Sequence, residues 1–154
     1  SLMDNVGLPA DSSLPWVVDK LIEYGLRKRI KVMASGKMST PSGVAAALCL
    51  GADSVNTARG FMFALGCIQA LQCNKNTCPT GITTHDPKLQ KGLDPELKAV
   101  RVANYARNLL HEVEVVAHSC GVVNPYELGR EHAYLVTANG LPQRLTDRYP
   151  DTAT

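Results

Sequence analysis

The chain contains 154 residues, of which 45% are hydrophobic, and its 16 lysines and arginines nearly balance its 14 aspartates and glutamates. A chain of this length buries roughly 70% of the surface that it exposes when unfolded, so one domain with a real core is expected. The net charge of +2 and the aromatic content of 5% do not indicate a nucleic acid or an anionic membrane as partner.

The first half of the chain alternates between helical spacing of apolar residues and short apolar runs. This order is typical of α/β folds with parallel strands. The predicted elements are, in chain order, a helix over 13–24, a strand over 30–34, a helix over 40–50, a strand over 53–57 and a helix from about Gly60 toward Gln72.

The second half of the chain begins with an irregular loop over residues 73–93, rich in Asn, Pro and Gly. Because a loop of this length inside a compact domain usually has a function or a ligand, it marks a candidate site. A long helix is predicted from Asp94 and a short one over 124–128. From Ala138 onward the sequence is polar and interrupted by proline, so we expect an arm or a mobile segment.

Two segments place a glycine between the end of a predicted strand and the following helix. Such turns let backbone N–H groups approach a phosphate, and an arginine adds a bidentate donor. Each segment alone is also compatible with an ordinary turn, and Lys37 with a solvated loop lysine. The two segments are Ser35-Gly36-Lys37 and Ala58-Arg59-Gly60.

Three of the five cysteines, Cys67, Cys73 and Cys78, lie within twelve positions and are followed by Pro79. Thiolates bind iron–sulfur clusters and zinc, and a proline after the last cysteine also occurs in ferredoxin-type sequences. A zinc site and three unrelated thiols remain alternatives at this point. The other two, Cys49 and Cys120, lie on predicted apolar helices and are expected to be buried structural thiols.

The chain lacks a predicted membrane span and a basic, apolar leader, so we expect a cytoplasmic protein. Ser1-Leu2 before Met3 has the character of a cloning remnant.

Several motifs together resemble the flavin domain of glutamate synthase, most closely the flavin-dependent proteins of prokaryotic type. The resemblance extends over about residues 7–94, and the cysteine spacing with its Leu-Gly-Cys lead is specific. The motifs are Ala34-Ser35-Gly36-Lys37, Leu50-Gly51-Ala52-Asp53, Phe63-Ala64-Leu65-Gly66-Cys67, Asn76-Thr77-Cys78-Pro79-Thr80-Gly81 and Asp86-Pro87.

The resemblance implies a (β/α)₈ barrel that binds FMN and a 3Fe-4S cluster and makes L-glutamate from 2-oxoglutarate and ammonia-derived nitrogen. It also implies which residues bind the cofactors. No residue of this chain is a convincing general acid or base. The FMN phosphate would be bound by Ser35, Gly36, Lys37, Ala58, Arg59 and Gly60, and the cluster by Cys67, Cys73 and Cys78.

A (β/α)₈ barrel needs ~250 residues, so we expect residues 1–93 to form only its last βα units and residues 94–154 a helical extension. We then expect the rest of the barrel, or another subunit, and an electron donor as partners. Open strand edges also imply self-association. Where larger glutamate synthases carry Gly-Thr, this chain has Ala58-Arg59, and we expect no glutamine-hydrolysing domain. Alternatives are a non-catalytic electron-transfer or assembly module, an FMN-barrel oxidoreductase with another substrate, and a zinc-stabilised structural domain.

Overall fold

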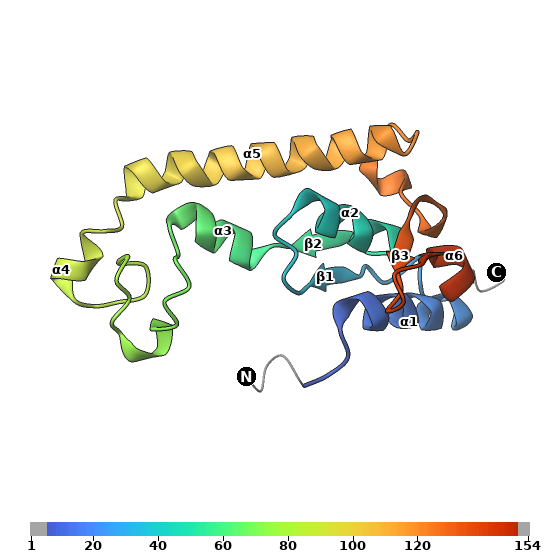
Figure 1. Ribbon diagram of the computed structural model, residues 1–154, viewed down its shortest axis with the longest axis horizontal. Coiled ribbons are helices and arrows are strands. Elements are labelled where there is room, and N and C mark those ends of the chain that lie inside the picture. Colours follow the sequence, from blue (N-terminus) through green and yellow to red (C-terminus); the bar gives the residue numbers. More distant parts are fainter. Residues whose placement is uncertain (1–5, 151–154) are drawn as a thin grey trace.

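The computed structural model describes residues 6–150 (Figure 1); Ser1-Leu2 therefore lies outside the described residues. Helices and strands alternate through the first half, and a 25-residue helix dominates the second. The elements are α1 (Ala10–Glu23), β1 (Met33–Ser35), α2 (Pro41–Cys49), β2 (Ser54–Asn56), α3 (Ala58–Leu65), η2 (Cys73–Lys75), α4 (Pro87–Gln90), α5 (Pro95–Ser119), η3 (Pro125–Glu127), η4 (Arg130–His132), β3 (Tyr134–Val136), β4 (Pro142–Arg144) and α6 (Leu145–Arg148).

The centre of the fold is the parallel pair β1 and β2, with Met33 opposite Ser54 and Ser35 opposite Asn56. Helix α1 lies on one side of the pair, and α2 and α5 lie on the other (Figure 1). The mixed helix and strand order with a parallel pair confirms the predicted α/β class. Within residues 6–150, no helix is both long and apolar enough to cross a membrane.

Local sequence explains where the main helices begin. The Thr40 hydroxyl accepts a hydrogen bond from the Gly43 N–H at 3.3 Å, and Pro41 occupies the first turn of α2. The Asp94 carboxylate caps α5 by accepting from the N–H groups of Glu96 and Leu97 at 3.0 and 3.1 Å. Both starts agree with the sequence-based expectation.

The prediction that the third helix continues toward Gln72 is wrong. Helix α3 ends at Leu65, because Gly66 adopts a left-handed conformation with φ 106° and turns the chain. The apolar residues beyond it do not continue a helical face. Ile68 and Leu71 are instead 65% and 81% exposed.

The core lies between α1, α2, the strands and the C-terminal half of α5. Its members on α5 are Val113 and Ala117, whereas Leu97 and Val100, near the start of the helix, are exposed. The buried apolar residues are Leu14, Val18, Ala34, Ala45, Ala47, Leu48, Cys49, Leu50, Ala52, Val113, Ala117, Leu128 and Leu145.

Of the two alternatives expected after Ala138, a packed arm or a mobile segment, the structure shows a packed segment, and part of it is a regular strand. Strands β3 and β4 form an antiparallel hairpin, and Gly140 with φ 78° lies in its turn. Leu145, which follows β4, is only 2% exposed and belongs to the core. Arg130 adds a buried anchor, since its guanidinium binds the Asp19 carboxylate of α1 and the Tyr149 carbonyl oxygen.

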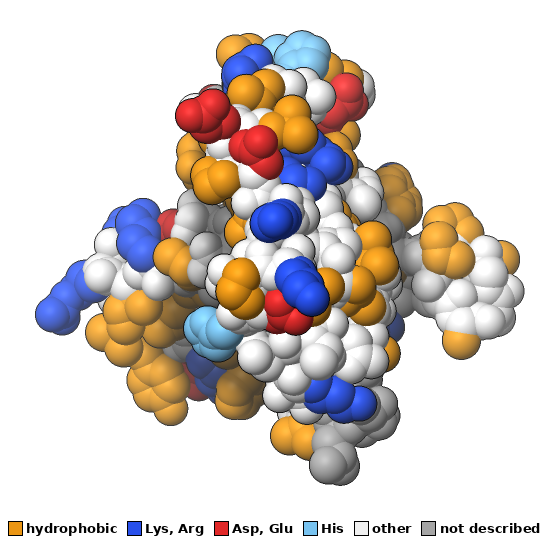
Figure 2. Space-filling view, turned by 90° about the vertical axis from the view of Figure 1, so that its left-hand side faces the viewer, with side chains coloured by type: hydrophobic (Ala, Val, Ile, Leu, Met, Phe, Trp, Pro, Cys, Tyr) orange, Lys and Arg blue, Asp and Glu red, His pale blue; other side chains and the backbone are white. Residues whose placement is uncertain are grey.

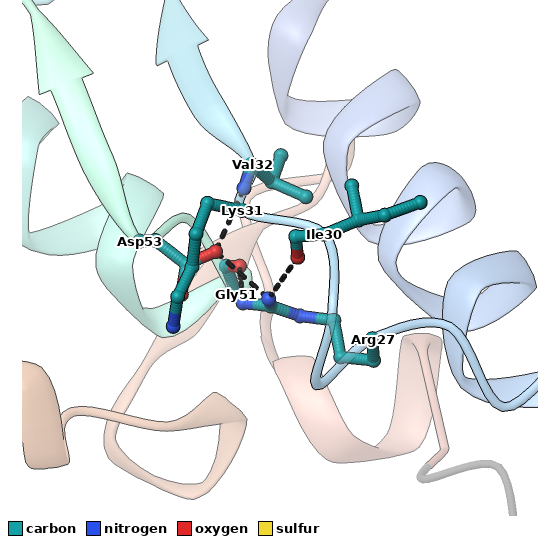
Figure 3. Close-up of polar contacts among 6 residues, drawn as sticks. All are labelled: Arg27, Ile30, Lys31, Val32, Gly51 and Asp53. Carbon is teal, nitrogen blue, oxygen red and sulfur yellow. Dashed lines mark hydrogen bonds and ion pairs between the residues drawn. The ribbon is translucent and has the colours of Figure 1, made fainter.

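Asp53 anchors the entry into both central strands (Figure 3). Its carboxylate accepts from the Val32 N–H at 2.7 Å and pairs with Arg27 at 2.8 Å and Lys31 at 3.1 Å. Arg27 also donates to the Gly51 carbonyl oxygen at 2.9 Å. Burial opposes ionisation of Asp53, but the hydrogen bonds from Arg27, Val32 and Lys31 outweigh it and lower its pKa to about 2.

Replacing Asp53 by asparagine should lower the free energy of unfolding by about 2 kcal/mol at neutral pH, because charge-assisted hydrogen bonds are lost. The pKa of Asp53 lies below its ordinary value of 3.8, so its ionised form stabilises the fold above that pH and the contribution disappears as the pH falls toward 2. Urea unfolding at several pH values should therefore show the difference between the two proteins shrinking from about pH 5 to pH 2.

Glu23→Gln is the matched control, because the Glu23–Lys20 pair is exposed on both sides and should contribute almost nothing. A pH-independent difference between Asp53→Asn and the unaltered chain would contradict the role assigned to the carboxylate.

Candidate functional site

The segments that follow β1 and β2 meet at the carboxyl end of the strand pair. The parallel register puts Ser35 beside Asn56, so the segments that follow the two strands leave the pair at the same end. A hollow of about 550 Å³ opens there. It is lined by Ser35, Gly36, Lys37, Met38, Asn56, Ala58, Arg59, Met62, Phe63, Cys67, Gln69, Leu71 and Cys73.

Five of the six residues predicted to bind phosphate line this hollow, and Gly60 does not. Gly60 is buried on the other side of α3, where an added Cβ would lie 1.8 Å from the Tyr105 hydroxyl oxygen. The glycine at this position therefore makes room for a tyrosine of α5. Gly60 thus contacts the Tyr105 side chain and does not line the hollow.

The backbone after β1 takes a tight turn that brings it close to the hollow. Gly36 has φ 138° and Lys37 has φ 56°, so both lie in the left-handed region. After β2, Ala58 and Arg59 form the first turn of α3, whose leading N–H groups have no partner within the helix. The positive end of the α3 dipole and the exposed Arg59 guanidinium together make this end of the strand pair suitable for an anion.

Apolar side chains cover another part of the same hollow. Met38 follows the first loop, and Met62 and Phe63 lie on α3. A hollow with a polar end and an apolar wall suits a ligand that joins a charged group to a flat ring. Sequence reasoning missed these residues, although the apolar positions of α3 were a signal for them.

The cysteine loop borders the hollow on its second side. Cys67 and Cys73 line the hollow itself, and all three predicted ligands, Cys67, Cys73 and Cys78, line a smaller pocket beside it. Across the described range, no three His, Cys, Asp or Glu side chains stand close enough to enclose one metal ion.

Hydrogen bonds favour the thiolate form of Cys78. The Thr80 hydroxyl oxygen lies 3.3 Å from the Cys78 sulfur, and Thr80 together with the Thr83 N–H lowers the pKa of Cys78 to about 6. Burial has the opposite effect on Cys49 in the core, whose pKa is raised to about 11. The thiolate is the form that binds metals, so the loop cysteine is prepared for that role and the core cysteine is not.

The rest of the loop is held by its own polar contacts. The Thr84 hydroxyl donates to the Asn76 carbonyl oxygen at 2.7 Å, and the Asn76 side chain accepts from the His85 N–H at 2.6 Å. Gly81 packs so closely on Leu89 that a Cβ would lie 2.3 Å from its carbonyl oxygen. These contacts fix the segment that carries Cys78 without a regular helix or strand.

The cysteine loop lies at the end of the molecule that also carries α4. Seen from that end, hydrophobic side chains reach the surface in several places among lysines and arginines (Figure 2). Exposed Ile68 and Leu71 belong to this loop, and Leu71 has a left-handed φ of 55°. The loop thus exposes two apolar side chains between Cys67 and Cys73.

Comparison with known proteins identifies the family of the chain. Residues 1–123 match the family described as a conserved region in glutamate synthase. The chain is 50% identical over 131 residues to the glutamate synthase large subunit-like protein YerD of Bacillus subtilis, an alignment that covers 85% of this chain and 25% of YerD.

Two more distant relatives agree with this match. The archaeal glutamate synthase (NADPH) of Methanocaldococcus jannaschii is 39% identical over 77% of this chain and 23% of its own length. A glutamate synthase large subunit-like protein of Rhizobium meliloti is 29% identical over 99% of this chain and 39% of its own length. The chain spans about a quarter of the first two relatives. It belongs to the glutamate synthase family.

Proposed function

We propose that this chain is the C-terminal part of a glutamate-synthase-type (β/α)₈ barrel that binds FMN and a 3Fe-4S cluster. Together with the rest of the barrel, it would make L-glutamate from 2-oxoglutarate and ammonia-derived nitrogen. The observation that carries the proposal is the single hollow bordered by both predicted phosphate loops and by Cys67 and Cys73. One surface would thus offer an anion site and sulfur ligands side by side.

The parallel pair supports the assignment to a barrel. In (β/α)₈ barrels the ligand site lies at the carboxyl ends of the strands, and a phosphate is frequently bound after the seventh and eighth strands. The loops after β1 and β2 lie at that end of their pair. With only a quarter of its longer relatives covered, the chain would take the remaining strands from the rest of the protein or from another subunit.

The phosphate of FMN would be held by the turn at Ser35, Gly36 and Lys37 and by the first turn of α3 at Ala58 and Arg59. The left-handed turn admits a close approach of the backbone, and the Arg59 guanidinium can donate two parallel hydrogen bonds to phosphate oxygens. Met38, Met62 and Phe63 would exclude water beside the ring. A bound FMN would supply hydride transfer, which no side chain of this segment provides.

The 3Fe-4S cluster would be held by Cys67, Cys73 and Cys78, which share one pocket. Three sulfur ligands match three irons. Around a single zinc ion, by contrast, thiolate sulfurs lie about 3.8 Å apart, and the part of the chain that is described holds no group so compact. The donors Thr80 and Thr83 would stabilise the Cys78 thiolate, and the cluster would supply one-electron transfer.

Anaerobic reconstitution of the chain with iron and sulfide tests the ligand assignment. The unaltered chain should retain about three irons, and Cys73→Ser should retain far less, because one of three ligands is gone. Iron and labile sulfide analysis, with visible absorption, provides the measurement. In a complete barrel the same substitution should leave FMN affinity largely intact.

Cys120→Ser is the matched control, since Cys120 lies at the end of α5 and outside the loop. It should retain as much iron as the unaltered chain. Equal iron contents in Cys73→Ser and Cys120→Ser would remove Cys73 from the ligand set.

The 154-residue chain by itself should not make glutamate, because the remaining barrel loops that would hold the substrate are supplied elsewhere. Glutamate formation from 2-oxoglutarate and ammonium, with a chemical electron donor, provides the assay. The full-length archaeal glutamate synthase (NADPH) of Methanocaldococcus jannaschii serves as the positive control. Turnover by the short chain would contradict its assignment as one part of a larger site.

A further inference from the structure

A tyrosine of α5 contacts both of the loops that border the hollow. The Tyr105 hydroxyl donates to the Ser39 carbonyl oxygen at 3.1 Å, and it lies 3.1 Å from the Thr57 hydroxyl oxygen. A tyrosine hydroxyl has one proton to donate, and here it is donated to the Ser39 carbonyl oxygen. The Thr57 hydroxyl is therefore the donor in the second bond. Tyr105 thereby joins the segment before α2 to the segment before α3.

Packing fixes the tyrosine ring at this point. It meets Phe61 edge-on, with ring centroids 5.1 Å apart and an interplanar angle of 83°. Its hydroxyl occupies the space that a side chain at Gly60 would need. The ring is therefore seated between two residues of α3, and its hydroxyl has little freedom to turn elsewhere.

The bond to Tyr105 changes what Thr57 does for its own helix. Thr57 stands at the N-cap of α3, yet its side chain makes no capping hydrogen bond. Thr40 holds the same place before α2, and its hydroxyl does accept from the Gly43 N–H. The N-terminus of α2 is thus closed by its own threonine, whereas that of α3 is left open beside the hollow.

We propose that Tyr105 is a positioning residue of the flavin site: it engages the Thr57 hydroxyl, which makes no capping bond to α3, so that the Arg59 N–H stays available to the FMN phosphate. A capping side chain accepts from the N–H of the second or third helical residue, here Arg59 or Gly60, and at Arg59 it would compete with the ligand. The inference rests on the proposed function, and it adds α5, beyond the cysteine loop, to the residues that shape the phosphate site.

Tyr105→Phe keeps the ring and removes the hydroxyl, which frees Thr57 to cap α3. FMN should then bind about fivefold to tenfold more weakly, while riboflavin, which lacks the phosphate, binds as before. Adding Thr57→Val should recover most of the FMN affinity, because the competing cap is gone. Flavin fluorescence titrations of the full chain measure all three proteins, and Tyr126→Phe, an exposed tyrosine, should behave as the unaltered chain.

Equal losses for FMN and riboflavin, or an unchanged FMN affinity in Tyr105→Phe, would overturn the positioning role and leave the proposed function standing. If the unaltered chain binds FMN no better than riboflavin, the phosphate site of the proposed function fails instead. Amide hydrogen exchange at Arg59 and Gly60 then decides the role of Tyr105. Slower exchange in Tyr105→Phe supports it, because the cap has formed, and equal or faster exchange overturns it.

Discussion

The parallel pairing of β1 with β2 is the constraint on which the rest of the structure depends. Because the strands run in the same direction, the segments after Ser35 and after Asn56 leave the pair at its carboxyl end and border one hollow. Asp53 fixes the start of this pairing through Val32, Arg27 and Lys31 (Figure 3). Helix α5 lies along one side of the strand pair and contributes Tyr105, which contacts both of these segments.

Features set by local sequence could be predicted. The caps at Thr40 and Asp94, the two short strands and the irregular cysteine loop follow from residues within a few positions of one another. The loops at Ser35–Lys37 and Ala58–Arg59 were found for the same reason, since a glycine or an arginine after a strand is a local signal. Cys49 was correctly expected in the core. The division of the chain at residue 93 stays a prediction.

Features set by contacts between distant segments were missed. The Arg130–Asp19 pair joins residues 111 positions apart, and Tyr105 is one tyrosine on a long helix without a motif. Two features had local signals that were overlooked. Gly66 turns the chain at the end of α3, and Asn139-Gly140 between apolar residues signals a hairpin that was not predicted. Gly60, expected at the phosphate, lies against Tyr105 because helix geometry turns it to the opposite face.

The central claim is that sulfur ligands and a flavin phosphate site share one hollow. Diffraction at the iron absorption edge, from crystals of the anaerobically reconstituted chain grown with FMN, tests it most directly. The account predicts anomalous iron density among Cys67, Cys73 and Cys78, with the phosphate between the Ser35–Lys37 turn and the first turn of α3. Cysteines without iron, zinc in its place, or a phosphate bound away from this hollow would contradict it.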